Sequence, residues 1–321
     1  MRPEKWTMNE STPNVLALAS CKMGVDPANY VGADIRFEQV TPTFGAVSRR
    51  MRITNWDLFD GMVLAVTFTD GRAHKMEGTA IMVAPGVALC AKHVFDDYLS
   101  ETAKTVGTTF CFRIAKSGAQ AWLVTRLQVV PRTDLCILGL EYQSILAAAP
   151  IFRQASITTR LPKVGEQLII SGFRASSPVF ESKGGGSIDL SAEMLICSGV
   201  VTAQYPTASG RDRVTAPWPC IEVDCPSWGG MSGGPVLDQR GFIVGLISRG
   251  WNCADDPSPM LTALLWPALG LEMKSFGWPP SLGSAGRSLL NMKECRIEGA
   301  DAIRISESVP DTLETIYVPW S

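Results

Sequence analysis

The chain has 321 residues, with 29 basic and 31 acidic side chains and a formal net charge of −2 at pH 7. Hydrophobic residues make up 46% and charged residues 19%, which suits a packed core and is too apolar for a disordered chain. This charge balance gives no electrostatic reason to expect nucleic acid as a partner. The longest strongly apolar stretch, residues 260–271, is too short to span a bilayer, so we expect no membrane partner either.

The start of the chain lacks an apolar core behind its basic residues, so we expect no secretory signal peptide. The nine cysteines form no C-x-x-C pair and the chain has only two histidines, so we expect no metal site and no cofactor. Several cysteines, such as Cys136, lie in apolar runs where a reduced thiol acts as a small hydrophobic side chain. These features predict a reduced, cytoplasmic protein, although Cys220 and Cys225 could be bridged in an oxidising compartment.

Short apolar runs separated by glycine and proline turn signals fill the middle of the chain, which indicates an all-β sandwich or barrel. The expected strands span residues 62–69, 75–83, 87–91, 109–114, 122–130, 135–140, 167–172, 194–204, 221–224, 235–237 and 242–248. Helical spacing of apolar residues predicts a terminal helix over 259–271.

Other segments carry weaker patterns. Residues 142–162 show little alternation and are interpreted as the connection between two sub-domains. Residues 182–187 include three consecutive glycines and predict a flexible loop. A possible strand lies at 302–306, near the end of the chain.

The sharpest chemical signal is the sequence GGMSGGPV at residues 229–236, between two expected strands. Glycines around Ser232 allow a tight turn with positive φ angles. Such a turn can aim the N–H groups of Gly230 and Ser232 at the point where an oxyanion forms during acyl transfer. The alternative is a glycine-rich hairpin without chemistry.

A serine hydroxyl needs a nearby base before it can act as a nucleophile, and the chain offers only His74 and His93. His74 lies in a polar turn and is expected at the surface. His93 directly follows the apolar strand 87–91, where the scaffold can hold its ring. A purely structural histidine is the alternative at that position.

The third member of such a site is a buried carboxylate that orients the imidazole. Asp134 leads into the apolar run 135–140, and aspartate is rarely buried unless it is paired. Asp96 and Asp97 are nearer to His93 in sequence, but we expect them to be solvated in a helical turn. Asp134 is therefore the predicted orienting carboxylate.

The order of these residues along the chain discriminates between serine hydrolase folds. The glycines flanking Ser232 also fit the nucleophile elbow of α/β-hydrolases, but that fold needs a histidine after the serine and none follows here. The subtilisin order places an aspartate before the histidine and belongs to an α/β fold, which does not suit a strand-rich chain. The order that fits is His93, Asp134, Ser232.

Three separated motifs, AKHV at 91–94, DLCIL at 134–138 and GMSGGP at 230–235, together resemble the trypsin/chymotrypsin superfamily of serine endopeptidases. The pattern Lys163-x-Gly165-Glu166, followed by Gly172-Phe173, also resembles the bacterial branch that includes glutamyl endopeptidases and high-temperature-requirement proteases. The resemblance covers roughly residues 60–270. It implies an all-β fold of two packed antiparallel six-stranded barrels, with the triad in the cleft between them.

This fold implies four segments along the chain. They are an N-terminal extension (1–55), a first barrel with His93 and Asp134 (56–150), a second barrel with the nucleophile loop and a terminal helix (151–272), and a C-terminal extension (273–321).

The nucleophile loop departs from the family at one position. Secreted trypsins carry an aspartate just before the nucleophile, which pairs with a newly cut N-terminus, and Met231 stands there in this chain. The resemblance therefore implies no activation of that type. The loop must be ordered by its own contacts or by a partner.

By family position, the substrate pocket is lined by Ser227 and Trp228 on one wall and by Ser248, Arg249 and Gly250 on the other. The backbone of 248–250 would pair with an extended substrate. No aspartate occupies the trypsin-like pocket position, so a strict preference for arginine or lysine is not implied. An aspartate from the loop at 255–256 could still reach in, or Arg249 could favour an acidic side chain.

The expected activity is that of an intracellular trypsin-like serine endopeptidase, which cleaves protein or peptide substrates through an acyl-enzyme. A regulatory partner, an inhibitor or the two extensions could restrain it, as in a bacterial effector that cuts one dedicated target. The alternative is a catalytically degenerate trypsin-fold module used for binding or scaffolding. The two unassigned extensions and Met231 motivate this alternative, and the intact triad argues against it.

Overall fold

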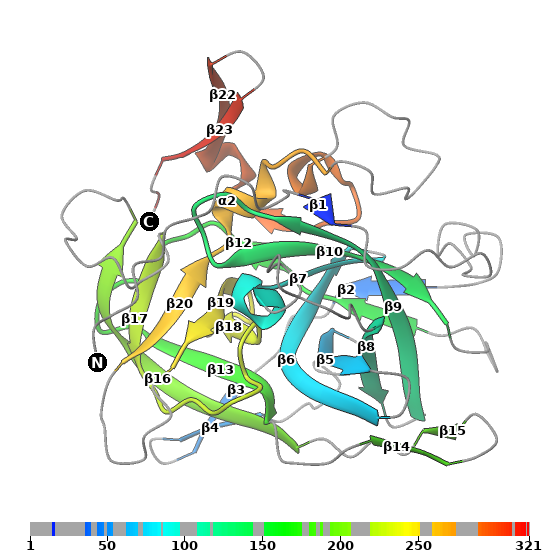
Figure 1. The fold of residues 1–321 in the computed structure, drawn as a ribbon. Helices are drawn as coiled ribbons and strands as arrows, with labels where there is room; N and C mark the ends of the chain where they lie inside the picture. Colours follow the sequence, from blue (N-terminus) through cyan, green and yellow to red (C-terminus); the bar gives the residue numbers. More distant parts are fainter. Residues whose placement is uncertain are drawn as a thin grey trace, which may run out of the picture.

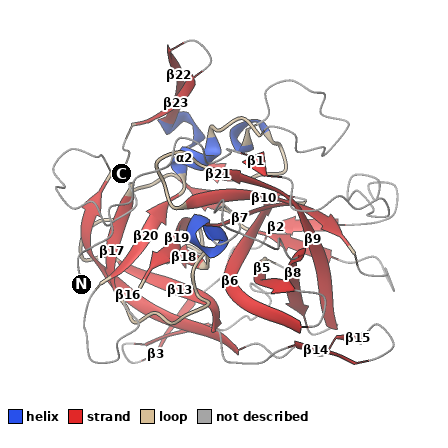
Figure 2. Ribbon diagram, viewed as in Figure 1, coloured by secondary structure: helices blue, strands red, loops and turns tan. Residues whose placement is uncertain are grey.

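β-Strands dominate the computed structural model of this chain, and its helices are short (Figure 2). The structure describes residues 15–16, 36–39, 44–47, 50–53, 62–69, 73–84, 86–96, 108–115, 118–143, 151–174, 180–183, 187–188, 193–206, 219–250, 259–273, 288–309, 312–318 and 320. Within these ranges, none of the helices has the length and apolar character needed to cross a bilayer.

Six antiparallel strands close the first barrel in the order β6-β5-β8-β9-β10-β7, with β7 returning to pair with β6. The strands are β5 (Val63–Thr69), β6 (Ala73–Ala84), β7 (Val87–Ala91), β8 (Thr108–Ala115), β9 (Gly118–Val129) and β10 (Leu135–Tyr142).

Strands β7 and β10 of this barrel are buried along almost their whole length. On β10, Cys136 and Leu138 belong to the barrel interior, whereas Leu135 and Ile137 face a larger core that extends into the second barrel. Successive side chains of a strand point to opposite faces, so a strand buried on both sides reads as a continuous apolar run. This explains why the sequence located these strands without clear alternation.

The second barrel closes in the same way, in the order β18-β13-β16-β17-β20-β19, with β18 pairing back to β19. The strands are β13 (Gln167–Arg174), β16 (Glu193–Tyr205), β17 (Cys220–Asp224), β18 (Pro235–Leu237), β19 (Ile243–Arg249) and β20 (Met260–Leu264). The fold is therefore two six-stranded antiparallel barrels side by side (Figure 1), as predicted.

The predicted helix over 259–271 was wrong for its first half. Residues Met260–Leu264 form strand β20, which pairs with β17 on one side and β19 on the other, and only α2 (Trp266–Leu269) is helical. All five residues of β20 are buried, so the run shows no alternation that could separate a strand from a helix. Pro267, in the first turn of α2, fits the start of a helix.

Both extensions add strands to the barrels. β1 (Val15–Leu16) pairs with β9, and β2 (Arg36–Gln39) pairs with β11 (Ile151–Gln154) in the predicted connection. β3 (Phe44–Val47) and β4 (Arg50–Ile53) form a hairpin. At the other end, β21 (Ile297–Glu298) pairs with β12 (Ile157–Thr158), which itself pairs with β19.

The remaining elements are short. β22 (Ile303–Val309) and β23 (Thr312–Tyr317) form a hairpin that includes the possible strand at 302–306. Two 3₁₀ turns precede it, η5 (Leu289–Asn291) and η6 (Ala300–Ala302). The three glycines of the predicted loop at 182–187 lie outside the described residues, but their flanks form β14 (Phe180–Lys183) and β15 (Ser187–Ile188). β14 pairs with β6 of the first barrel.

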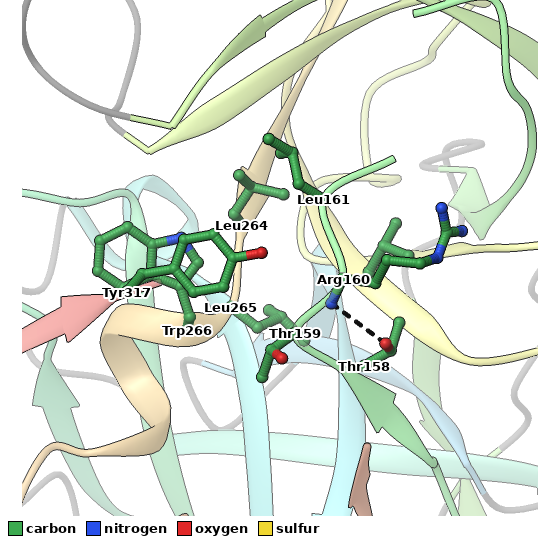
Figure 3. A pocket seen from close by; sticks show the side chains of 9 residues that line it. Thr158, Thr159, Arg160, Leu161, Leu264, Leu265, Trp266 and Tyr317 are labelled. Atoms are coloured by element: carbon green, nitrogen blue, oxygen red, sulfur yellow. Dashed lines mark hydrogen bonds between the residues drawn. The ribbon is translucent and has the colours of Figure 1, made fainter. Parts of the chain in front are cut away.

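The C-terminal extension is packed against the second barrel. The ring of Tyr317 stacks on Trp266 of α2, with centroids 5.3 Å apart, beside a pocket whose lining includes Arg160 and Leu161 (Figure 3). Trp320 Nε1 donates a hydrogen bond to Thr159 Oγ1 at 2.7 Å. The end of the chain is thus tied to the start of the second barrel.

Candidate active site

Strand register in the first barrel brings His93 beside Asp134. β7 is followed at once by the 3₁₀ turn η3 (Lys92–Phe95), and the first pair between β10 and β7 is Leu135 with Ala91. Asp134 therefore lies opposite Lys92, whose N–H donates to the Asp134 carbonyl at 3.0 Å. The backbone N–H of His93 also donates to Asp134 Oδ1, at 2.9 Å. These two backbone contacts fix the carboxylate relative to the imidazole.

The three side chains singled out from the sequence converge between the barrels. His93 Nδ1 lies 2.7 Å from Asp134 Oδ2, and His93 Nε2 lies 2.8 Å from Ser232 Oγ. The Asp134 carboxylate is only 5% exposed and the imidazole 25%, so one face of the histidine reaches solvent. This arrangement allows the ring to pass a proton to or from the hydroxyl while the carboxylate stabilises its charged form.

A fourth group completes the surroundings of the carboxylate. Ser248 Oγ, fully buried at the end of β19, donates to Asp134 Oδ2 at 2.5 Å. Asp134 therefore accepts from the His93 backbone and from a hydroxyl of the second barrel, besides facing the imidazole. Hydrogen bonds of this kind offset the cost of burying a polar side chain.

The nucleophile sits at the end of a tight turn. The N–H of Met231 donates to the carbonyl of Trp228 at 3.1 Å, and Gly230 in the third position has φ +89°. Gly229, in the second position, does not have a positive φ. The turn from Trp228 to Met231 is therefore of type II, which requires a positive φ only at its third position. Neither Gly230 nor Ser232 donates its N–H to an acceptor in the described part of the chain.

The glycines after the nucleophile allow the second barrel to approach the first. Gly233 has φ +85°, and a Cβ there would overlap the carbonyl of Thr79 on β6. A Cβ on Gly234 would overlap the carbonyl of Ser171 on β13. The N–H of Gly233 donates to Ile247 at 2.7 Å, so the loop is also held to β19. Only glycine suits such approaches of backbone to backbone.

Thr79 of the first barrel holds the nucleophile loop of the second. Its hydroxyl donates to the Gly230 carbonyl at 2.8 Å and accepts from the N–H of Phe173 at 3.0 Å. Its N–H donates to the Ser232 carbonyl at 2.8 Å. Sequence reasoning missed Thr79 and the Ser248 hydroxyl contact, because a single hydroxyl in an apolar strand carries no local signal.

Met231 is ordered by packing. Its side chain is fully buried in the large core, and a Cβ added to Gly172 would come within 2.9 Å of the Met231 Cα. Gly172 belongs to the motif that resembles the opening of the second barrel, so that motif makes room for the loop. The loop is therefore ordered by its own contacts in this structure.

The other acid and base candidates lie elsewhere. Asp96 is 41% exposed and pairs with Lys92, whose Nζ lies 3.0 Å from its Oδ1. Asp97 and the side chain of His74 lie outside what the structure describes. His74 itself belongs to β6, which begins at Ala73, so the polar turn predicted around it is shorter than expected.

The predicted pocket residues lie on two neighbouring walls. Ser227 and the exposed Trp228 lead into the nucleophile turn, Arg249 is the last residue of β19, and Gly250 follows it. A Cβ on Gly250 would overlap Ser227 Oγ, so the two walls touch at this point. The Ser248 side chain is turned to Asp134, which leaves only its backbone for a substrate. The loop at 255–256 lies outside the described residues.

In the described ranges, no group of three or more His, Cys, Asp or Glu side chains could hold a metal ion. All seven cysteines in these ranges are free. Cys220 is the first residue of the extended strand β17 and Cys225 follows its last residue, so the two are roughly 16 Å apart at ~3.3 Å per residue. A disulfide needs Cα atoms within about 7 Å, so the bridge considered from the sequence is excluded in this fold.

Comparison with known proteins shows to which family this chain is similar. The family model described as trypsin-like peptidase domain matches residues 78–246, more than half of the chain. No curated protein matches the chain in sequence.

Several solved structures are similar to this chain in fold. An inactive mutant of Rv3671c from M. tuberculosis H37Rv is 16% identical with a TM-score of 0.44, over 70% of this chain and 91% of that chain. The MamO protease domain from Magnetospirillum magneticum is 17% identical with a TM-score of 0.43, over 65% and 94%. Deg5 is 16% identical with a TM-score of 0.43, over 65% and 86%.

Proposed function

Because this chain belongs to the trypsin-like peptidase family and is a serine protease, we propose that it cleaves peptide bonds with a triad of Ser232, His93 and Asp134. The observation that carries the proposal is the unbroken chain of contacts from Asp134 through His93 to Ser232, at 2.7 and 2.8 Å. Both distances lie within hydrogen-bond reach, which is the first requirement for a general base and its nucleophile.

In this mechanism, Ser232 Oγ attacks the scissile carbonyl while His93 Nε2 accepts its proton. Asp134 stabilises the imidazolium that forms. His93 then gives the proton to the leaving amine, and an acyl-enzyme on Ser232 is left. A water molecule, deprotonated by His93, attacks the acyl-enzyme and releases the second product.

The oxyanion of each tetrahedral intermediate would be held by the N–H groups of Gly230 and Ser232. Two observations support these donors: the type II turn at Gly230, and the lack of an acceptor for either N–H among the described residues. Gly230 is buried, and an N–H in such a place needs an acceptor that a substrate can supply. A preformed donor of this kind is worth about 3–4 kcal/mol of transition-state stabilisation.

We expect the substrate to bind as an extended strand. Ile247 of β19 exchanges hydrogen bonds with Gly233 and Gly234 of the nucleophile loop, so the end of β19 runs directly beside Ser232. A peptide added along Ser248–Gly250 would pass its scissile bond over the hydroxyl, a strand-addition mode. Because Ser227 touches Gly250, we expect the side chain bound between these walls to be small.

An active-site fluorophosphonate probe tests the assignment of the nucleophile. Wild type should be labelled and Ser232→Ala should not, with heat-denatured wild type as the control for nonspecific reaction. Retained folding of the variant is checked by circular dichroism. Equal labelling of wild type and Ser232→Ala would overturn the triad proposal.

The remaining parts of the proposal concern the setting. We propose an intracellular protease restrained by a partner or inhibitor, such as an effector that cuts a dedicated target. The free, largely buried cysteines support a reducing compartment. Separate cytosolic and extracytoplasmic fractions, probed with an antibody to the chain, test the location. Recovery of the protein only outside the cytosol would contradict it.

The alternative, a binding module without turnover, makes a different prediction. It requires a folded protein that neither reacts with the probe nor cleaves a broad peptide library. Among the described residues, no observation at the site favours it over hydrolysis, because His93 and Ser232 lie within bonding reach.

A further inference from the structure

Two thiols meet at the neighbouring strands β16 and β17 of the second barrel, outside the proposed triad. Cys197 lies on β16, and Cys225 follows directly after the end of β17. The Cys225 thiol donates to Cys197 Sγ at 3.1 Å. Cys225 is buried, whereas Cys197 is partly exposed, so the pair can be reached from solvent on one side.

The strand pairing explains why these two cysteines meet. Asp224, the last residue of β17, pairs with Val200 of β16, so Cys225 continues alongside Gly199. Cys197 and Gly199 are two residues apart and point to the same face of β16. A Cβ on Gly199 would come within 2.6 Å of the Cys225 Cβ, so the missing side chain makes the space in which Cys225 approaches Cys197.

The two thiols differ in their tendency to ionise. The hydrogen bond from Cys225 lowers the pKa of Cys197, although burial opposes this. The same hydrogen bond, together with burial, raises the pKa of Cys225. Cys197 is thus the nucleophilic thiol, and Cys225 is the protonated neighbour that can react with it in a second step.

A second pair of cysteines serves as an internal contrast. Cys90 and Cys136 are paired across β7 and β10, but both are fully buried. The Cys90 thiol donates to the Thr79 carbonyl at 3.1 Å, and the Cys136 thiol faces the Cys90 carbonyl. Burial raises the pKa of Cys90 well above its ordinary value. Neither thiol of this pair is accessible to a peroxide, and the raised pKa of Cys90 disfavours its reactive thiolate.

We propose that Cys197 and Cys225 are a reversible oxidation site, in which hydrogen peroxide oxidises the two thiols to a disulfide between them. The Cys197 thiolate attacks one peroxide oxygen, the O–O bond breaks, and a sulfenic acid forms on Cys197 as one water is released. The Cys225 thiol then attacks the Cys197 sulfur, and the S–S bond forms as the second water leaves. Both thiols are oxidised, and the peroxide is reduced by two electrons.

The site lies next to the predicted substrate wall. Pro226 is the residue between Cys225 and Ser227, and its carbonyl oxygen lies 3.4 Å from Cys225 Sγ and 3.8 Å from Cys197 Sγ. Disulfide formation replaces the thiols beside this carbonyl with an S–S bond, which cannot donate a hydrogen bond. The oxidation state of the pair thus acts on the segment that leads into the nucleophile turn.

The test measures oxidation rather than peptidase activity, so it is independent of the proposed function. Full-length Ser232→Ala protein, with Cys21→Ser and Cys253→Ser to remove the thiols outside the described residues, is treated with a few equivalents of hydrogen peroxide. Remaining thiols are alkylated, and the chain is mapped by mass spectrometry. We expect a loss of two hydrogens, a peptide linking 197 to 225, and full reversal by dithiothreitol.

Two further variants separate the steps. With Cys225→Ser added, dimedone should trap a sulfenic acid on Cys197. With Cys197→Ser added, no disulfide should form, and Cys225 should react at least about tenfold more slowly than Cys197 does.

A link between Cys90 and Cys136 that forms first would overturn the proposal. Peroxide treatment that leaves 197 and 225 as separate thiols or separate sulfinic acids would also overturn it. Circular dichroism before and after treatment shows that the reaction took place on folded protein.

Discussion

The two barrels contribute to the site by different means. In the first barrel, His93 and Asp134 are set by strand register, because the ends of β7 and β10 are paired and the backbone N–H of His93 bonds the carboxylate. In the second barrel, Ser232 stands on a loop whose shape depends on Gly230 and on a hydroxyl from the first barrel, Thr79. The histidine and the aspartate are thus positioned by the sheet that carries them, whereas the serine loop is positioned partly by a residue of the other barrel.

The difference has a consequence for mutation. Residues fixed by register should affect the chemical step alone, because changing them leaves the sheet intact. Residues that hold the loop should affect the reaction indirectly, through the placement of the Gly230 and Ser232 N–H groups. The contacts between the C-terminal extension and the second barrel should matter for stability rather than for the reaction, because they hold the end of the chain to that barrel.

The largest effect is expected for Asp134→Asn in the first barrel. An amide can keep the contacts with the backbone, but it favours the wrong tautomer of His93. We expect kcat to fall by about 10⁴-fold with little change in KM and in the midpoint of thermal unfolding. Steady-state kinetics and a thermal melt measure these quantities. A fall of less than about tenfold would show that Asp134 does not orient the base.

A smaller effect is expected when the link between the barrels is removed. Thr79→Val deletes the hydroxyl that bonds Gly230 and Phe173 but keeps the branched shape. We expect kcat to fall about 10- to 100-fold, somewhat less than the loss of a whole oxyanion donor.

Thr67→Val is the matched control, because Thr67 is equally buried in the same barrel and its hydroxyl bonds only within it, to Phe110. It should leave kcat within about threefold, since it removes a neutral hydrogen bond remote from the loop. Equal losses in the two variants would show that the loop does not need its support from the first barrel.

The smallest effect is expected on the pH dependence of stability, from the ion pair between Arg240 and Glu298 that ties the C-terminal extension to the second barrel. Glu298 of β21 accepts two hydrogen bonds at 2.7 Å from Arg240, and these lower the pKa of its carboxyl. A lowered pKa in the folded state means that this stabilisation is present above the ordinary glutamate pKa and is lost as the pH falls through the folded value. The free energy of unfolding should therefore decrease in mild acid, and Glu298→Gln should flatten that decrease.

Chemical denaturation across pH 3–7 measures the effect, which should be about 1 kcal/mol or less because the pair is partly exposed. Peptidase activity of Glu298→Gln near neutral pH should equal that of wild type. An unchanged slope of stability against pH would show that the tie contributes nothing.

Much of the fold could be predicted because the strands are buried on both faces and end at clear turn signals. Val87–Ala91 is predicted with its observed bounds, and the order of His93, Asp134 and Ser232 follows from the few histidines in the chain. The strand Met260–Leu264 was taken for a helix because a short, fully buried run carries no period.

Other features depend on contacts that no local pattern contains. Thr79 and Ser248 act through hydroxyls that reach across the two barrels. Cys197 and Cys225 meet because the pairing of β16 with β17 places Cys225 beside Gly199, which has no side chain. The position of the C-terminal hairpin also escaped prediction. In Figure 1 the hairpin β22–β23 stands well away from η3, which carries His93 between the barrels. The hairpin therefore does not lie over η3.

The buried Met231 separates this chain from proteases that are made as dormant precursors. The nucleophile loop is held by the apolar Met231 side chain and its close approach to Gly172, so it takes its shape when the barrel folds and needs no ion pair with a new N-terminus. We therefore expect that the loop needs no cut elsewhere in the chain to take this shape. We expect any control over when the protein acts to come from the partner or inhibitor proposed above.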